Sequence, residues 1–484
     1  MKSPGIKLLG LGPGKVELLT RQAWDLLENS PEIYLRTIHH PIVPALPPQL
    51  RIHSFDDLYE SCETFEEVYN KIIAQVLELG NQPQGVIYAV PGHPFIAEAT
   101  SPEIARQAEA QGLSVNVVPG MSFLEPTLTA LRIDPLPQTV LVDALELVVN
   151  HVPNFSPGVP ALLAQVYSNE VASEVKLTLM AVYPDEHPVK LVHSAGLDNE
   201  LIEDLPLYMI DQSPYIGLLT SLYIPPLDPF TSFEAFHETI AHLRAPDGCP
   251  WDREQTHKSL RPYLLEETYE VLTALDSDDP ESMKEEFGDL LLQIFLHAQI
   301  ASENGEYNIV DVLKGINLKI VNRHPHVFGK LDLIDSKSVL LNWEKMKAEE
   351  RISNGKDKDG ILDGVAITLP ALVQAEQYQK RASRVGFNFD EGQILFEKLE
   401  NDLTMIFSDL KRGDPSEKIG EFLFRIVNFA RQKKVDSESA LREANARFHK
   451  RIQYIERSAQ AQGLSIDKLS KKEKKKIWKT SLDQ

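Results

Sequence analysis

Acidic side chains crowd among leucines in the stretch LLEETYEVLTALDSDDPESMKEEFGDLLLQIFLH, residues 264–297. On a helix, Glu266 and Glu267 each share a face with Glu270, because residues three or four apart are neighbours. Glu286 and Asp289 form a second pair of this kind. Such a pattern is typical either of a solvated helix face or of oxygen ligands for a hard cation such as Mg²⁺ or Mn²⁺.

The segment between the two acidic pairs, LTALDSDDP, is long enough to end one helix and turn into another. Asp279 is suited to cap the second helix, and Pro280 to occupy its first position. The two acidic faces can therefore meet in an antiparallel hairpin. Like charges held together in apolar surroundings are costly unless a cation neutralises them.

A repeat in the helical part of the chain helps to decide between these interpretations. EEFGDLLLQIFLHAQ (285–299) aligns with EKIGEFLFRIVNFAR (417–431), LEETYEV (265–271) with LENDLTM (399–405), and INLKIVNR (316–323) with ANARFHKR (444–451). The apolar framework recurs, but four of the acidic positions become Asn401, Thr404, Lys418 and Glu421. The fold therefore does not require the acids, which favours a metal site in the first copy.

The elements that position these residues change character along the chain. Up to about Pro229, the runs IKLLGLG, GVIYAVPG, LSVNVVPG, ALLAQVYS and KLTLMAVYP are expected to be strands. They alternate with helical segments such as TRQAWDLLEN and TFEEVYNKIIAQVLELG, which predicts a mostly parallel sheet covered by helices. After the proline-rich stretch SLYIPPLDPF (221–230), helical periodicity dominates. We therefore expect a multidomain chain with an α/β part followed by an all-α tandem region.

Composition narrows the function classes. A chain of 484 residues with 43% hydrophobic residues is globular and long enough for several domains. Its formal charge of −22 argues against general nucleic-acid binding, and the basic tail KLSKKEKKKIWK is interpreted as a solvated helix. Cys62 and Cys249 form no metal-binding or disulfide pattern. With no signal peptide and no long apolar run, we expect a cytoplasmic protein without a membrane partner.

The acidic stretch and its flanks resemble the MazG nucleoside triphosphate pyrophosphohydrolases. The likeness covers about residues 232–460 and includes the EExxE and ExxD patterns, GCPWDREQTH (248–257), RHPHVFG (323–329) and NWEKMKAEER (342–351). It implies cleavage of a nucleoside triphosphate (NTP) to the monophosphate (NMP) and pyrophosphate. The ligands of Mg²⁺ or Mn²⁺ would be Glu267, Glu270, Glu286 and Asp289, and Glu266 would hold or activate the attacking water.

The same resemblance places phosphate contacts at Asn317, Lys319 and Arg323. Trp251 would either stack on the base or belong to the core. We expect structural roles for the three histidines of these motifs, His257, His324 and His326. The second copy would be a packing partner or a dimer surface, and we expect a homodimer because isolated helical units expose apolar surface.

The loop that follows the first expected strand, GLGPGK, contains Gly10, Gly12 and Gly14. A dinucleotide-binding loop would run directly into its helix, whereas Pro13 interrupts this one and the helix starts only near Thr20. The glycine spacing alone is therefore weak evidence for a nucleotide cofactor.

Together with AVPGHPFIAEAT (89–100), VVPGMSFLEP (117–126) and KLTLMAVYPDEHPVKLV (176–192), this loop resembles the tetrapyrrole (corrin/porphyrin) methylase family over about residues 5–225. The resemblance implies two α/β lobes with S-adenosylmethionine between them. The loop of Gly10, Gly12, Pro13 and Gly14 would face the methyl acceptor, which is unknown. His93 stands where the family usually has an aspartate. The expected cofactor contacts are Pro91, Gly92, His93, Pro94, Phe95, Ile96, Ala97, Met121, Ser122 and Tyr167.

The leading interpretation is a Mg²⁺-dependent NTP pyrophosphohydrolase with an N-terminal S-adenosylmethionine-dependent methylase-like domain. The expected domains are residues 1–228 (methylase-like), 229–350 (MazG with intact acids) and 351–484 (degenerate second MazG copy). One alternative makes methyl transfer the main activity and the helical region a dimerisation element. Another is a nucleotide or S-adenosylmethionine sensor without turnover, which the five intact acids disfavour.

Overall fold

The structure is a computed structural model that describes residues 4–331, 335, 338–339, 342–343, 346, 350, 360–387, 389–409 and 416–481. The chain forms two compact units, Met1–Glu254 and Gln255–Gln484. The polar stretch EERISNGKDKDG (349–360), which lies between the two copies of the repeat in the sequence, is outside the described residues except for Glu350 and Gly360.

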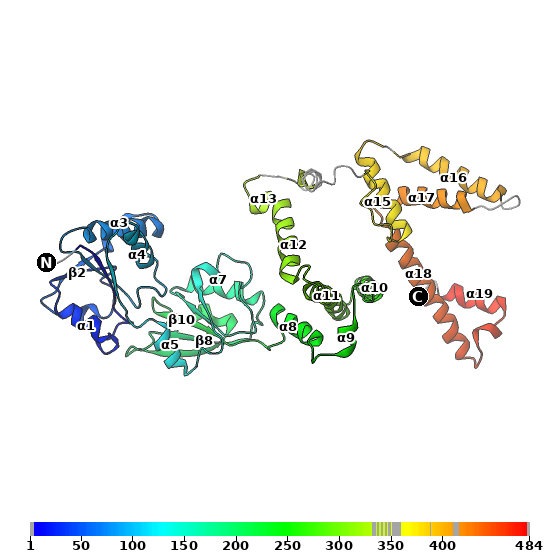
Figure 1. The fold of residues 1–484 in the computed structure, drawn as a ribbon. Coiled ribbons are helices and arrows are strands. Elements are labelled where there is room, and N and C mark those ends of the chain that lie inside the picture. Colours follow the sequence, from blue (N-terminus) through cyan, green and yellow to red (C-terminus); the bar gives the residue numbers. More distant parts are fainter. Residues whose placement is uncertain are drawn as a thin grey trace. The chain divides into compact units, whose positions relative to one another are not determined.

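The first lobe of the N-terminal unit is a parallel five-stranded sheet with the order β3-β2-β4-β1-β5. Helix α1 packs on one face of this sheet and helices α3 and α4 on the other (Figure 1). Helices α1 and α3 begin after Thr20 and Thr64, whose side chains accept bonds from the backbone three residues on. The elements are β1 (Ile6–Gly10), α1 (Arg21–Glu28), β2 (Glu32–Leu35), β3 (Arg51–Ser54), α2 (Asp56–Ser61), α3 (Phe65–Gly80), β4 (Val86–Val90), α4 (Thr100–Ala110) and β5 (Val115–Val118), with short 3-10 turns at Val16–Leu18 and Val43–Ala45.

The second lobe has a mixed five-stranded sheet with the order β6-β7-β10-β8-β9. Only β6 and β7 pair in parallel; β10 is antiparallel to β7 and β8, and β8 is antiparallel to β9. The predicted mostly parallel sheet therefore holds for the first lobe but not for the second. The elements are α5 (Leu124–Leu131), β6 (Val140–Asp143), α6 (Ala144–Leu147), β7 (Ala161–Ala164), α7 (Asn169–Met180), β8 (Pro188–His193), β9 (Leu201–Pro206), the 3-10 turn η3 (Leu207–Gln212) and β10 (Thr220–Ile224).

The predicted strand KLTLMAVYP (176–184) is wrong, because its first residues complete helix α7. The Ser168 side chain accepts a bond from the backbone N–H of Val171 and starts this helix. Val171, Val175 and Leu179 then follow at intervals of four and are buried in the core of the second lobe. The segment is apolar, as predicted, but the buried residues recur every four positions, as on a helix, and not every two, as on a strand.

Two helices follow the second lobe and end the first unit, namely α8 (Phe233–Arg244) and α9 (Pro250–Glu254). Ser232 caps α8 by accepting a bond from the backbone N–H of Ala235. The close turn before α9 requires glycine at position 248, because a Cβ there would lie 2.3 Å from the carbonyl oxygen of His242.

In the described residues of the second unit, turns and irregular segments join helices, and no strand occurs. Helices α10 (Arg261–Ser277) and α11 (Pro280–Glu303) pack as a hairpin, followed by α12 (Ile309–Arg323) and α13 (Pro325–Phe328). Asp279 caps α11 and Pro280 takes its first position, as predicted. Asn308 caps α12 with a reciprocal bond to Asp311.

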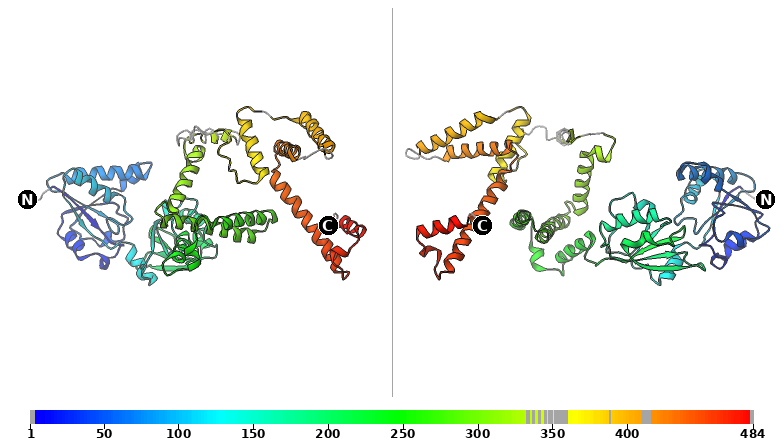
Figure 2. Two further views of the ribbon diagram at one scale, coloured as in Figure 1. Left: turned by 45° about the vertical axis from the view of Figure 1, so that its right-hand side comes forward. Right: turned by 180° about the vertical axis from the view of Figure 1, so that it is seen from behind.

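The part of the chain aligned by the repeat forms a second set of packed helices. Helices α16 (Gly392–Asp409) and α17 (Ser416–Gln432) pack together, and α15 (Ala371–Arg384) contacts α17 and α18 (Ser437–Gln460). Helix α19 (Lys471–Thr480) packs beside α18, as the two views of Figure 2 show, through the contacts of Trp478 with Phe448 and Arg451. The predicted fold class, an α/β region followed by helices, is confirmed. Within the described residues, no helix is both long and apolar enough to cross a bilayer.

Candidate functional site

The hairpin of α10 and α11 brings the predicted metal ligands together. Glu267, Glu270 and Glu286 each offer a carboxylate oxygen, and these three oxygens all lie within 4.8 Å of one another. Asp289 is one turn beyond Glu286 and acts electrostatically on both Glu267 and Glu286. We call Glu267, Glu270, Glu286 and Asp289 the acidic cluster. The predicted convergence of the two acidic faces is thus what the hairpin produces.

Electrostatics within the acidic cluster are unfavourable as long as no cation is bound. Burial, followed by the negative charges of Asp289 and Glu270, raises the pKa of Glu267 above its ordinary value of 4.5. Desolvation and the charges of Glu270, Glu285 and Asp289 raise the pKa of Glu286 in the same way. Among the described residues, no lysine or arginine forms an ion pair with a member of the cluster. The donor set consists of carboxylates alone, which suits Mg²⁺ or Mn²⁺.

Other predicted nucleotide-site residues lie on neighbouring elements. Glu266 is exposed on α10, next to the cluster, and contributes to the raised pKa of Glu267. Asn317 and Lys319 are exposed on α12, which packs against α11. Arg323, at the end of α12, donates two bonds to the carboxylate of Glu350 and lies over the ring of Trp343. The phosphate role predicted for Arg323 would therefore require exchange of Glu350 for a phosphate.

The remaining predicted residues of this region are spread over both units. Trp251 lies on α9 in the first unit and is 53% exposed. His257 and His297 stack in parallel in the second unit, with their Nδ1 atoms 2.7 Å apart. The Nδ1 atom of His324 contacts the carbonyl oxygen of Ile320, and its ring meets Trp343 edge-on. In these contacts, His257 and His324 meet other groups of the protein, and their structural role stays a prediction.

The carboxyl ends of β1, β4 and β5 in the first lobe approach one another at three glycines. A Cβ on Gly10 would lie 2.4 Å from the nitrogen of Gly120, and a Cβ on Gly120 would lie 2.3 Å from the carbonyl oxygen of Gly92. Gly12 and Gly92 also exchange two backbone hydrogen bonds, of 3.2 and 2.9 Å. Only glycine allows this close backbone contact, which joins the Gly10–Gly14 loop to the predicted cofactor loop at 91–97.

His93 forms a tight turn within this predicted cofactor loop. Its Nδ1 atom accepts a hydrogen bond from the backbone N–H of Phe95 at 3.0 Å, and its carbonyl oxygen accepts one from Ile96 at 3.2 Å. An aspartate at this position could accept the same bond, because Asp side chains commonly bind the backbone two residues on. The histidine can therefore form the same turn as the aspartate that the resemblance led us to expect at this position.

The other predicted cofactor residues lie near the ends of strands. Ser122 is buried, and its backbone N–H and hydroxyl both donate to Glu125 at the start of α5. Tyr167 follows β7 and packs against the core of the second lobe. Gln165, two residues earlier, has a positive φ of 65° and donates to Asp143 at 3.0 Å. These loops all follow the carboxyl ends of strands, where α/β folds bind ligands.

Comparison with known proteins finds two family models that match different parts of the chain. The model of the MazG nucleotide pyrophosphohydrolase domain matches residues 255–328, and that of the tetrapyrrole (corrin/porphyrin) methylases matches residues 5–211. The nucleoside triphosphate pyrophosphohydrolase/pyrophosphatase MazG of Thermotoga maritima is 40% identical over 51% of this chain and 94% of its own length. The chain belongs to the MazG family.

Its N-terminal part is a tetrapyrrole methylase-like domain. Both parts together are shared with the uncharacterized protein YabN of Bacillus subtilis, which is 39% identical over 98% of this chain and 97% of its own length. Among solved structures, the uroporphyrin-III-C-methyltransferase of Thermus thermophilus matches with a TM-score of 0.37 and 17% identity. That match covers 46% of this chain and 92% of the methyltransferase.

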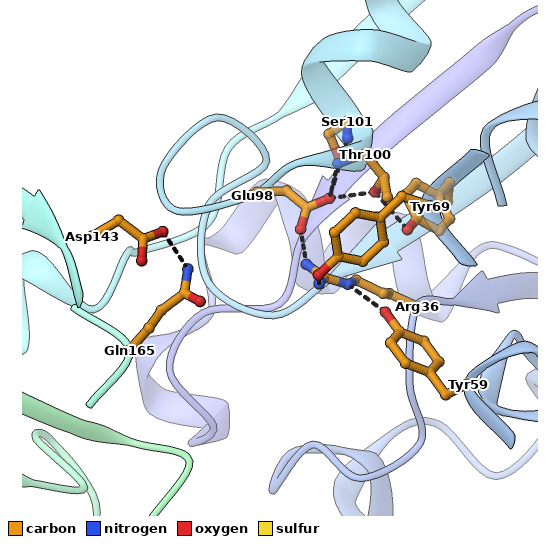
Figure 3. A network of polar contacts seen from close by, with 9 residues as sticks. Arg36, Tyr59, Tyr69, Glu98, Thr100, Ser101, Asp143 and Gln165 are labelled. Carbon is orange, nitrogen blue, oxygen red and sulfur yellow. Dashed lines mark hydrogen bonds and ion pairs between the residues drawn. The ribbon is translucent and has the colours of Figure 1, made fainter. Parts of the chain in front are cut away.

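The MazG chain carries one polar network in its methylase-like domain that the sequence analysis did not identify (Figure 3). Arg36, directly after β2, forms an ion pair with Glu98 and donates hydrogen bonds to the hydroxyls of Tyr59 and Tyr69 at 3.0 and 3.1 Å. Arg36 and Glu98 are 62 positions apart, so no local pattern could have revealed their contact. A charged residue directly after a buried strand was the available signal.

His40, which lies beside Gly12, was also missed. It is 5% exposed, and burial lowers its pKa to about 4, partly offset by a bond to the backbone of Gly12. The ring is therefore neutral at neutral pH and lies beside the loop predicted to face the acceptor. Lys15, on that loop, pairs with Asp198 of the second lobe at 2.6 Å.

Proposed function

We propose that this MazG chain hydrolyses nucleoside triphosphates to nucleoside monophosphates and pyrophosphate, using Mg²⁺ or Mn²⁺ held by Glu267, Glu270, Glu286 and Asp289. The observation that supports this most strongly is the gathering of these carboxylates without a partner cation among the described residues. The MazG relatives from Thermotoga maritima and Escherichia coli carry the name nucleoside triphosphate pyrophosphohydrolase. A bound divalent cation would neutralise phosphate charge and polarise phosphorus.

Residues near the acidic cluster would activate the attacking water and bind the substrate. Glu266, next to the cluster on α10, would accept a proton from the water that attacks the α-phosphorus. The bond between this phosphorus and the bridging oxygen then breaks, and pyrophosphate leaves with the electron pair. Lys319 and Asn317 on α12 would bind the phosphate oxygens, and Arg323 would join them after releasing Glu350. For Trp251, which belongs to the first unit, stacking on the base stays a prediction.

We also propose that the chain has three domains: residues 1–228 (methylase-like), 229–350 (MazG) and 351–484 (second MazG copy). The last domain would be a degenerate MazG copy without its own cation site. In this copy Asn401 and Thr404 lie on α16, and Lys418 and Glu421 on α17. Arg425 pairs with Asp402 across the same two helices at 3.0 Å, so here a positive charge balances an acid. This domain would support the first copy or a second chain in a homodimer.

A second function is supported by the methylase-like domain, namely binding of S-adenosylmethionine and methyl transfer to an unknown acceptor. The observation in its favour is the close packing of Gly10, Gly92 and Gly120 at the carboxyl ends of three parallel strands. Pro91, Gly92, His93, Pro94, Phe95, Ile96, Ala97, Met121, Ser122 and Tyr167 would contact the cofactor, and Gly10, Gly12, Pro13 and Gly14 the acceptor. The chain supplies mainly positioning, which suits an in-line displacement at a sulfonium.

The position of bond cleavage tests the proposed hydrolysis. We would incubate a panel of NTPs and dNTPs with the protein and Mg²⁺ in water labelled with ¹⁸O. Mass spectrometry would then show which of the two products carries the label. Label in the monophosphate is expected, because water attacks the α-phosphorus. Label in pyrophosphate, or release of single phosphates, would assign the chain to another class of phosphohydrolase.

A further inference from the structure

The backbone of the predicted cofactor loop is strained beside the Arg36–Glu98 pair. Ala97 has φ of 52°, a left-handed conformation that non-glycine residues adopt at a cost. Such residues persist only where their surroundings hold them in place. The residue that follows Ala97 is Glu98, whose side chain is 2% exposed.

Glu98 joins the loop to helix α4. One of its carboxylate oxygens accepts hydrogen bonds from the backbone N–H groups of Thr100 and Ser101, at 2.9 and 3.1 Å, and from the Thr100 hydroxyl. The hydroxyl of Thr100 also contacts that of the buried Tyr88 on β4, at 2.8 Å. The loop therefore ends on a carboxylate that is bound to the first turn of α4.

Arg36 links the other carboxylate oxygen of Glu98 to helices α2 and α3. Its guanidinium group bonds Glu98, Tyr59 on α2 and Tyr69 on α3, each through a different nitrogen. The backbone N–H of Arg36 also bonds the carbonyl oxygen of Ala89 on β4, at 2.9 Å. Figure 3 shows the guanidinium group between the two tyrosine rings and the carboxylate.

A buried ion pair adds little net stability compared with apolar side chains of similar size, whereas its planar geometry fixes the groups that it joins. The position of this pair at the end of the 91–97 loop suggests what it fixes. We propose that Arg36 is a positioning residue that, through Glu98, holds the loop in the conformation that binds S-adenosylmethionine. This inference rests on the cofactor site proposed above, and the cofactor would contact the loop rather than Arg36.

The test compares Arg36→Met with Lys176→Met in the full chain. Lys176 pairs with Asp211 at 2.6 Å in the second lobe, and the two side chains are 17% and 19% exposed, so this pair is a matched control. Hydrogen exchange of the 91–99 segment is measured without ligand, and the affinity for S-adenosylhomocysteine by calorimetry. We expect faster exchange of the segment and roughly tenfold or greater loss of affinity in Arg36→Met only.

Tyr69→Phe is a milder second variant that still tests the proposal if Arg36→Met fails to fold, because it keeps the ion pair and removes a single hydroxyl. It should loosen the 91–99 segment to a smaller extent with an unchanged melting temperature. Equal exchange of this segment in the Arg36, Tyr69 and Lys176 variants would overturn the proposal, as would a loosened segment with unchanged affinity. A wild-type protein that binds no S-adenosylhomocysteine would refute the cofactor site, and the exchange data would then still decide whether Arg36 holds the loop.

Discussion

Glu267 on α10 and Asp289 on α11 face each other across a helical hairpin, close enough for the charge of Asp289 to raise the pKa of Glu267. Neither belongs to an ion pair with a lysine or arginine among the residues that the structure describes. A helix pair that gathers acids in this way is less stable than it could be. The cost is explained if the hairpin exists to hold a cation.

The first prediction concerns the stability of the cation-free protein. The raised pKa of Glu267 means that the folded chain binds this proton more tightly than the unfolded chain, whose value is near 4.5. Stability is therefore lost as pH rises from 4.5 through the folded value. Glu267→Gln removes this loss and should raise the melting temperature in EDTA at pH 7.5 by about 1–2 °C. A lower melting temperature for the variant under these conditions would contradict the account.

The second prediction concerns His297, whose pKa is lowered by burial and by the neighbouring His257. The folded state resists protonation of this ring, so stability should be lost as pH falls from 6.5 through the lower folded value. His257→Gln removes the neighbouring ring and should raise the pKa of His297 in an NMR titration. It should also reduce the fall in melting temperature between pH 7.5 and pH 5.5. An unchanged titration would mean that the two rings do not interact in solution.

Much of the helical hairpin could be predicted from sequence, whereas the second sheet could not. Asp279 and Pro280 are local signals for a helix start, and acids three or four residues apart reveal a shared face. The pairing of strands that are distant in the chain has no such local signal. The antiparallel contact of β8 with β10, for example, depends on packing across the lobe. The apolar residues of 176–184 fit both a strand and a buried helix face, and only the Ser168 cap favours the helix.

The third prediction tests the glycine contact at the ends of β1, β4 and β5. A Cβ on Gly120 would lie 2.3 Å from the carbonyl oxygen of Gly92, so the backbones must separate. Gly120→Ala should destabilise the first lobe by about 1–3 kcal/mol and accelerate hydrogen exchange in these strands. Gly217→Ala is the control, because nothing lies within 4 Å of a Cβ at that position. Similar exchange in the two variants would show that the close approach is absent.

The fourth prediction concerns His93, which accepts the backbone N–H of Phe95. His93→Asp retains an acceptor two residues before this N–H, so hydrogen exchange in the 91–97 loop should stay close to that of the wild type. His93→Ala removes the acceptor and should cost about 1 kcal/mol of local stability, seen as faster exchange. Equal behaviour of the two variants would mean that the bond does not organise the loop.

The most direct test of the central claim is the rate of pyrophosphate release from saturating NTP with Mg²⁺, measured for the wild type, Glu270→Gln and Glu281→Gln. Glu281 is an exposed acid on α11 that pairs with Lys284, so its variant removes the same charge outside the acidic cluster. We predict release that EDTA abolishes, a loss of about 100-fold or more in Glu270→Gln, and a wild-type rate in Glu281→Gln. Wild-type release by Glu270→Gln, or release that persists in EDTA, would contradict a catalytic cation at the acidic cluster.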